Sequence, residues 1–206
     1  MTPSSEQPQF ILASSSPRRR ELLASLGIHY TIIKPDIDET QHADETPLAY
    51  VKRLSQEKAR AVAEKLSDEA TILAADTIVI LAADTIGIEE TGELLGKPLD
   101  ADDARATLKR LRGRDHLVIT AFSLLKTGPD AASYTEAVQT KVTMRDYSDE
   151  AIEAYIASGD PFDKAGSYAI QNEAFHPVDH IDGSMTNVIG LPLDEVKQAL
   201  IEMGIL

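Results

Sequence analysis

The chain contains no cysteine among its 206 residues. Disulfide bonds and thiolate metal sites are therefore excluded, and the composition suits a reducing compartment. No apolar run approaches the roughly 20 residues that a membrane-spanning helix needs. The polar segment 1–9 also lacks the basic start and apolar centre of a secretory signal. We expect a cytoplasmic protein that has no membrane as a partner.

Basic residues are scarce as well. Twenty lysines and arginines face 34 aspartates and glutamates, so that the formal net charge is −14. Such a surface repels nucleic acid at long range, and we expect no nucleic acid as a partner. A small polyanionic substrate is still possible, because the electrostatic potential inside a cleft depends on the groups that line it. A divalent cation could neutralise part of the negative charge of such a substrate.

Several common signatures of catalysis and nucleotide binding are missing from the chain. It has no P-loop, no dinucleotide-binding fingerprint and no serine nucleophile elbow with histidine and aspartate partners. No low-complexity linker divides it, and its length is enough for one well-buried core. We predict an N-terminal extension over residues 1–9 and a single domain over residues 10–206.

Helical and strand-like patterns alternate along the chain, which predicts an α/β fold with a mixed sheet. An echo of Ala75-Asp76-Thr77-Ile78 eight residues later, at 83–86, predicts a bend or bulge between the copies, because one strand over 71–88 would be unusually long. The predicted helices cover residues 18–26, 47–66, 100–112, 149–157 and 192–203. The predicted strands cover residues 30–33, 71–75, 78–81, 117–125 and 134–144.

The segment Ser14 to Arg20, with the sequence SSSPRRR, follows a short apolar run and opens the first predicted helix. Free backbone N–H groups and the dipole of a helix N-terminus favour an anion, and arginine matches phosphate oxygens in pairs. A serine cap, a proline in the first turn and a solvated basic turn account for the same residues. These residues alone leave both interpretations open.

Other residues carry weaker signals. Asp76, at the predicted end of a buried strand, could bind a metal or accept a proton from water, or cap backbone N–H groups. Lys97, between Gly96 and Pro98, could contact a phosphate or belong to an ordinary turn. Lys58 could do the same or be a solvated helix residue. Gln171, at the predicted end of a short strand, could offer a donor and an acceptor to a pyrimidine ring.

Taken together and in this order, the motifs resemble the Maf family of nucleoside triphosphate pyrophosphatases, once described as septum-formation inhibitors. The resemblance covers nearly the whole chain from about Phe10. The motifs that carry it are Leu12 to Arg19, Glu57-Lys58-Ala59, Ala75-Asp76-Thr77, Gly96-Lys97-Pro98, Gly113 with His116, Val118 and Thr120, Asp163 to Gln171, and Asn187 to Pro192.

The resemblance implies a fold of the inosine triphosphatase type, with an elongated mixed sheet, flanking helices and two lobes around a cleft. It implies hydrolysis of a nucleoside triphosphate to the monophosphate and pyrophosphate with a divalent cation, Mg²⁺ or Mn²⁺, by a homodimer. Asp76 matches the family's proton acceptor, and Asp76 and Glu39 are the implied metal ligands. The positions implied to line the phosphate and metal site also include Ser14, Arg19, Lys58 and Lys97.

Substrate choice follows from three further positions of the resemblance. Arg18, Thr77 and Gln171 match the combination of the dTTP/UTP branch, whereas the sister branch that acts on 7-methyl-GTP has Trp, Gln and Glu there. The alternatives are specificity of the 7-methyl-GTP type, or a nucleotide-binding regulator of cell division with little catalysis.

The chain departs from the family pattern in two places. The segment from Asp76 to Lys97 is longer than usual, so that Asp84 is better placed when distance is measured back from Lys97. We assign the acid to Asp76, with an insertion that lengthens the following hairpin, and Asp84 stays the alternative. Asn172 also stands where many relatives have glycine.

Overall fold

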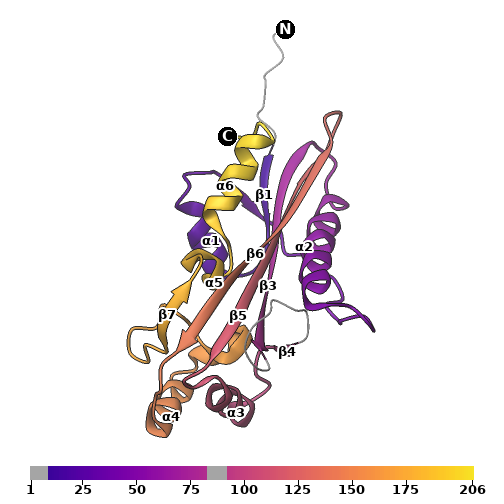
Figure 1. Ribbon diagram of the computed structural model, residues 1–206. Coiled ribbons are helices and arrows are strands. Elements are labelled where there is room, and N and C mark those ends of the chain that lie inside the picture. The colour runs from indigo at the N-terminus through magenta and orange to yellow at the C-terminus, as the bar shows by residue number, and fades with distance from the viewer. Residues whose placement is uncertain (1–8, 83–91) are drawn as a thin grey trace.

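A single mixed sheet organises the molecule (Figure 1), and the computed structural model describes residues 9–82 and 92–206. The strand order is β2-β1-β3-β5-β6-β7, and β4 pairs with β3 outside this path. β1 is parallel to both β2 and β3, whereas the other pairs are antiparallel. The strands are β1 (Gln9–Ala13), β2 (Thr31–Ile32), β3 (Ala70–Ala82), β4 (Gly92–Leu95), β5 (Asp115–Lys126), β6 (Ala132–Met144) and β7 (Val178–Asp182).

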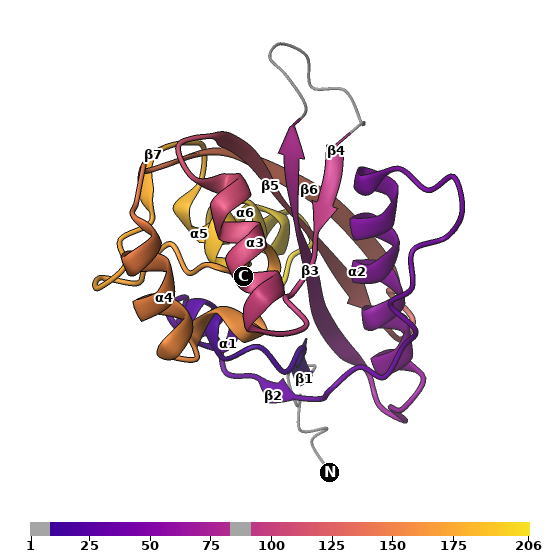
Figure 2. The ribbon, with the colours of Figure 1, turned by 90° about the horizontal axis from the view of Figure 1, so that it is seen from below.

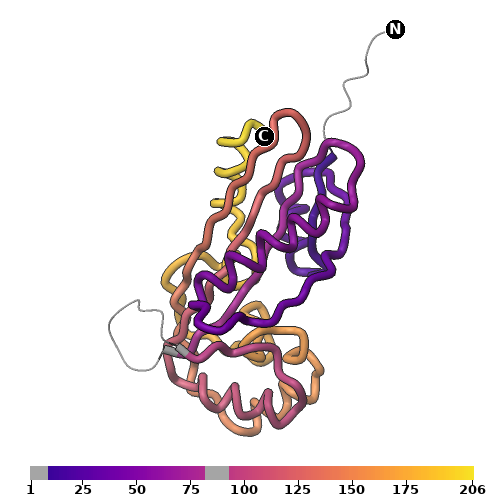
Figure 3. The backbone as a smooth tube through the Cα atoms, turned by 90° about the vertical axis from the view of Figure 1, so that its right-hand side faces the viewer, coloured from indigo at the N-terminus to yellow at the C-terminus, as the bar shows by residue number. Residues whose placement is uncertain are grey.

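Helices cover both faces of this sheet. α2 (Pro47–Ala63) lies on one face, and α1 (Pro17–Ala24), α5 (Met185–Ile189) and α6 (Leu193–Glu202) lie on the other, as the view along the long strands shows (Figure 2). α3 (Ala101–Leu111) and α4 (Asp149–Ala157) pack at one end of the strands, which makes the molecule elongated (Figure 3). Two short 3₁₀ helices, η1 (Asp160–Asp163) and η2 (Ala165–Ser167), follow α4. Within the described ranges, no helix is both long and apolar enough to span a bilayer.

The predicted helices are present, and their caps explain where they begin. Ser16, Thr46, Asp100 and Ser148 each accept a hydrogen bond from a backbone N–H of the first turn. On α2 the apolar positions recur at helical spacing and are buried against the sheet. β4, β7, α5 and the 3₁₀ helices were not predicted, and the strand expected before Gln171 is instead irregular chain after η2.

β3 corrects two predictions. The expected strands 71–75 and 78–81 form one strand, and its register with β5 is regular from Thr71 to Ile80, without a bulge. Asp76 therefore lies in the middle of a strand and not at its end. The sheet tolerates an acid there because α2 supplies a partner for it, as described below. The second copy of the echo, which contains Asp84, lies outside the described residues.

One edge of β3 is paired at both ends and open between them. β1 pairs with β3 up to Ala74, and β4 pairs with β3 from Val79 onward. Among the described strands, none pairs with residues 75–78 on that edge. Successive side chains of a strand point to opposite faces. Asp76 and Thr77 consequently project to opposite faces of the sheet yet both lie beside the same opening.

Candidate active site

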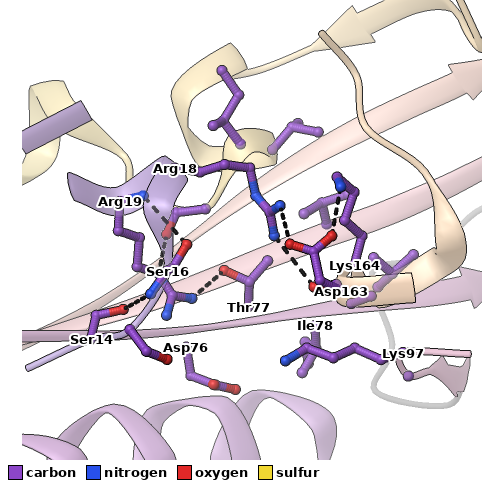
Figure 4. Close-up of a pocket in the computed structure, with 18 of the residues that line it drawn as sticks. Ser14, Ser16, Arg18, Arg19, Asp76, Thr77, Ile78, Lys97, Asp163 and Lys164 are labelled. Atoms are coloured by element: carbon purple, nitrogen blue, oxygen red, sulfur yellow. Dashed lines mark hydrogen bonds and ion pairs between the residues drawn. The ribbon is translucent and has the colours of Figure 1, made fainter. Parts of the chain in front are cut away.

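A cavity of about 780 Å³ lies at this open edge of β3. Its walls come from the start of α1, the segment 33–46, α2, β3, the end of β4, the segment 163–171 and Gly190. Figure 4 shows labelled side chains from several of these elements around the opening. Every site residue predicted from the sequence lines it: Ser14, Arg18, Arg19, Glu39, Lys58, Asp76, Thr77, Lys97 and Gln171.

On the α2 side, one lysine joins two carboxylates. Nζ of Lys58 lies 2.6 Å from Oδ1 of Asp76 and 3.0 Å from Oε1 of Glu39. The side chains of Lys58 and Asp76 are only 7 % and 12 % exposed, whereas that of Glu39 is 57 % exposed. Ion pairing offsets the cost of burying the lysine and the aspartate. Lys58 is thus a partner of the candidate acid and not a solvated helix residue.

On the α1 side, Arg19 is held by neutral groups. Its Nε donates to the carbonyl of Gly190 at 2.8 Å, and its Nη2 donates to Oγ1 of Thr77 at 3.0 Å (Figure 4). Gly190 adopts φ +123°, a conformation that glycine alone adopts without strain. Burial lowers the pKa of the Arg19 guanidinium, and the charge of Asp76 opposes that shift. Arginine stays protonated in proteins, so a full positive charge faces the cavity.

A chain of hydroxyl groups continues from Arg19 into the core. Oγ1 of Thr77 lies 2.9 Å from Oγ1 of Thr120, which donates to the carbonyl of Asn187 at 2.9 Å. A carbonyl can only accept, so Thr120 donates its one hydroxyl proton to Asn187. Thr77 must therefore donate to Thr120. Thr77 therefore accepts from Arg19, donates to Thr120 and keeps only acceptor capacity for a ligand.

Arg18 is paired across the cavity with a residue that the prediction had not assigned as its partner. Its Nη1 lies 2.9 Å from Oδ2 of Asp163, whose Oδ1 lies 2.6 Å from Nζ of Lys164 (Figure 4). The buried Lys164 also binds Asp160. The adjacent charges at 163 and 164 thus anchor Arg18 and the 3₁₀ segment to each other.

The remaining predicted residues lie at the rim or under the helix start. Lys97 is exposed, and the carbonyl of Gly96 beside it accepts from the N–H of Gly166 at 3.1 Å, which ties this turn to the segment that ends in Gln171. Ser14 is buried and accepts from the N–H of Ser16 at 3.2 Å. The serine cap expected for this turn is present, because Oγ of Ser16 accepts from the N–H of Arg19.

Charge distinguishes the cavity from the rest of the surface. Six basic side chains line it against three acidic ones, in a chain with a formal charge of −14. Two lining residues, Lys34 and Tyr50, were not predicted from the sequence, because neither belongs to a recognisable motif. Arg20 does not line the cavity. His116 lies behind it, where its Nε2 is 2.7 Å from the hydroxyl of Tyr168.

Comparisons with known proteins show the family of the chain. The model of the Maf family, described as Maf-like protein, matches residues 9–203. The chain belongs to the Maf family. It is 47 % identical over 196 residues to a protein of Geobacter sp. (strain M21) named dTTP/UTP pyrophosphatase, covering 95 % of this chain and 96 % of the relative. A relative with the same name from Myxococcus xanthus (strain DK1622) is 46 % identical, with 97 % and 95 % covered.

Among solved structures, a HAM1 protein from Coxiella burnetii superposes with a TM-score of 0.50 at 16 % identity, covering 95 % of this chain and 99 % of that one. At this identity the likeness shows the fold alone. It confirms the mixed α/β architecture that the Maf resemblance implied.

Proposed function

We propose that this Maf protein hydrolyses dTTP and UTP to the monophosphate and pyrophosphate. The observation that supports it best is the convergence of all nine predicted residues, from separate parts of the chain, on one cavity with a basic balance. The relatives named dTTP/UTP pyrophosphatase support the same activity. Arg18, Thr77 and Gln171, the combination that matches the dTTP/UTP branch by resemblance, line the cavity together.

A divalent cation fits the acidic side of the cavity. The carboxylates of Asp76 and Glu39 meet at one lysine nitrogen, so both can reach a common ligand. Across the described residues, no cluster of three or more histidine, aspartate or glutamate side chains could hold a metal. Mg²⁺ commonly takes one or two protein carboxylates and completes its shell with substrate phosphates and water, which matches this set. When bound, the cation neutralises phosphate charge and polarises the reacting phosphoryl group.

In the reaction we propose, the oxygen of a water molecule attacks the α-phosphorus and the bond to the bridging oxygen of the β-phosphate breaks. Asp76 accepts the proton that the water loses, and pyrophosphate leaves. Arg19, Lys58 and Lys97 stabilise the negative charge on the departing group. Arg19 suits this role because its guanidinium is already fixed by two neutral acceptors and needs little reorganisation.

The base is proposed to lie toward Arg18, Thr77 and Gln171. Thr77 has only acceptor capacity left, so it suits the N3–H of thymine or uracil. The amide of Gln171 is exposed at the rim and can pair with a ring edge that carries both a donor and an acceptor. A homodimer, implied by the family resemblance, and the cytoplasmic location expected from the composition are part of the same proposal.

The test is a panel of dTTP, UTP and 7-methyl-GTP with Mg²⁺, assayed for pyrophosphate and orthophosphate. We expect pyrophosphate from dTTP and UTP, and ¹⁸O from labelled water in the monophosphate product. Release of orthophosphate would contradict the bond assignment, and preference for 7-methyl-GTP would contradict the branch. Tight binding of dTTP without turnover would instead support a nucleotide-binding regulator.

A further inference from the structure

Glu39 reaches the cavity from a segment without regular secondary structure. Residues 33–46 form neither helix nor strand between β2 and α2. A carboxylate on such a segment has to be ordered before it can share a ligand with Asp76, and this ordering costs backbone conformational entropy. Yet the Glu39 carboxylate lies 3.0 Å from the lysine that also holds Asp76.

Two side chains of α2 hold this segment by its backbone. The hydroxyl of Tyr50 donates to the carbonyl of Glu39 at 2.7 Å. Nη2 of Arg53 donates to the next carbonyl, that of Thr40, at 3.0 Å. Two successive carbonyls are therefore fixed from a single helix.

The guanidinium of Arg53 is itself fixed on every side. Its Nε lies 2.7 Å from Oε1 of Glu45 and its Nη2 lies 2.9 Å from Oε2, a bidentate pair, while Nη1 lies 2.9 Å from Glu57. It also lies over the ring of Tyr50, 5.5 Å from the centroid. Lysine cannot reproduce this planar fork. The side chain of Glu45 is only 9 % exposed, so its carboxylate depends on Arg53.

We propose that Tyr50 and Arg53 are positioning residues, which act through Glu39 to set the affinity of the enzyme for its divalent cation. They contribute no ligand. They hold the backbone of residues 39 and 40 on α2, the helix that also carries Lys58, so that both carboxylates are preorganised for one ion. The inference rests on the proposed function, in which Asp76 and Glu39 bind that ion.

The experiment measures Mn²⁺ binding by electron paramagnetic resonance of the free ion, in the presence of the non-hydrolysable α,β-methylene analogue of UTP. We expect Tyr50→Phe to weaken Mn²⁺ binding about threefold and Arg53→Lys about tenfold, the range for losing one or two hydrogen bonds. At saturating Mg²⁺, kcat and the KM for dTTP of Arg53→Lys should stay within about twofold of wild type, because Arg53 does not line the cavity. The matched control is Arg60→Met, at an exposed position of the same helix.

Hydrogen exchange of the metal-free enzyme gives a readout independent of activity. We expect faster exchange across residues 33–46 in both variants and unchanged exchange in Arg60→Met. Wild-type Mn²⁺ affinity in Tyr50→Phe and Arg53→Lys would overturn the inference if Glu39→Gln binds Mn²⁺ more weakly. If Glu39→Gln also binds Mn²⁺ normally, the assignment of Glu39 as a ligand fails with it. Failure of the wild-type enzyme to hydrolyse dTTP would instead overturn the proposed function.

Discussion

The two sides of the cavity treat charge in opposite ways. On the α2 side, two carboxylates share one lysine, which leaves an excess of negative charge around Asp76. On the α1 side, Arg19 is bound only by a carbonyl and a hydroxyl, and within residues 9–82 and 92–206 no carboxylate pairs with it. The first side suits a cation and a proton, and the second suits phosphate oxygens. A nucleotide bound with its cation would satisfy both.

The largest effect should come from the acidic side. Asp76→Asn keeps the shape of the side chain but removes the proton acceptor, so we expect kcat to fall about 10²- to 10⁴-fold with a much smaller change in KM. Steady-state kinetics with dTTP measures both constants. The matched control is Asp84→Asn. Near-normal turnover in Asp76→Asn together with loss of activity in Asp84→Asn would transfer the role to Asp84.

The basic side should respond through phosphate binding. Arg19→Met removes a charge-assisted contact worth about 1.5–3 kcal/mol, so we expect kcat/KM for dTTP to fall roughly ten- to a hundredfold. Lys97→Met should act in the same direction. Arg20→Met serves as the control, because Arg20 does not line the cavity. Equal losses in the Arg19 and Arg20 variants would show that general basicity, not the geometry of Arg19, matters.

A smaller effect should follow when the support of Arg19 is altered and Arg19 itself is kept. Thr120→Val removes the hydroxyl that accepts from Thr77 and leaves the carbonyl of Asn187 without that donor. We expect kcat/KM to fall severalfold, while Thr120→Ser keeps the hydroxyl and stays near wild type. Kinetics of the two variants, with thermal unfolding as a check on folding, separates them. Full activity in Thr120→Val would show that the hydroxyl chain does not position Arg19.

The smallest effect on activity concerns a group on neither side. Burial lowers the pKa of His116 to about 4, whereas the unfolded value is about 6.5. Between these values the unfolded chain binds the extra proton, so the free energy of unfolding falls as pH drops from about 6.5 to 4, by up to about 1.4 kcal/mol per pH unit. Above pH 6.5 the histidine is neutral in both the folded and the unfolded state, and this loss of stability is absent.

His116→Phe should therefore flatten the acid side of the stability curve and leave the slope above pH 6.5 unchanged. Denaturant titrations of wild type and variant from pH 4 to 8 measure this. An equal slope in both proteins would mean that carboxylates alone govern acid unfolding.

Local sequence predicted the elements whose signals are local. Helices with a capping residue and an apolar stripe, such as α2 and α3, lie where the pattern placed them. β7 and α5 are five residues each, too short for a periodic pattern to stand out. Asp76 was assigned to a strand end because a carboxylate interrupts an apolar run. Only the packing of α2 reveals that Lys58 makes a mid-strand acid acceptable.

The residues that line the cavity could be named from the family motifs, but the pairs that they form could not. Asp163 lies 145 positions from Arg18 in the chain, and no local pattern couples the two. The hydrogen bond from Arg53 to the carbonyl of Thr40 could not be predicted either, because every residue has a backbone carbonyl and the sequence does not show which one accepts. Only the tertiary structure shows which charged side chains are ion-paired within the protein and which can still bind a ligand.

The open stretch of β3 also constrains where this chain can change length. Ten regular pairs hold the strand in register with β5, so a residue added or lost between Ala74 and Asp76 would turn the carboxylate toward the arginine and the hydroxyl toward the lysine. One codon would thus exchange the faces of the sheet on which these two side chains lie.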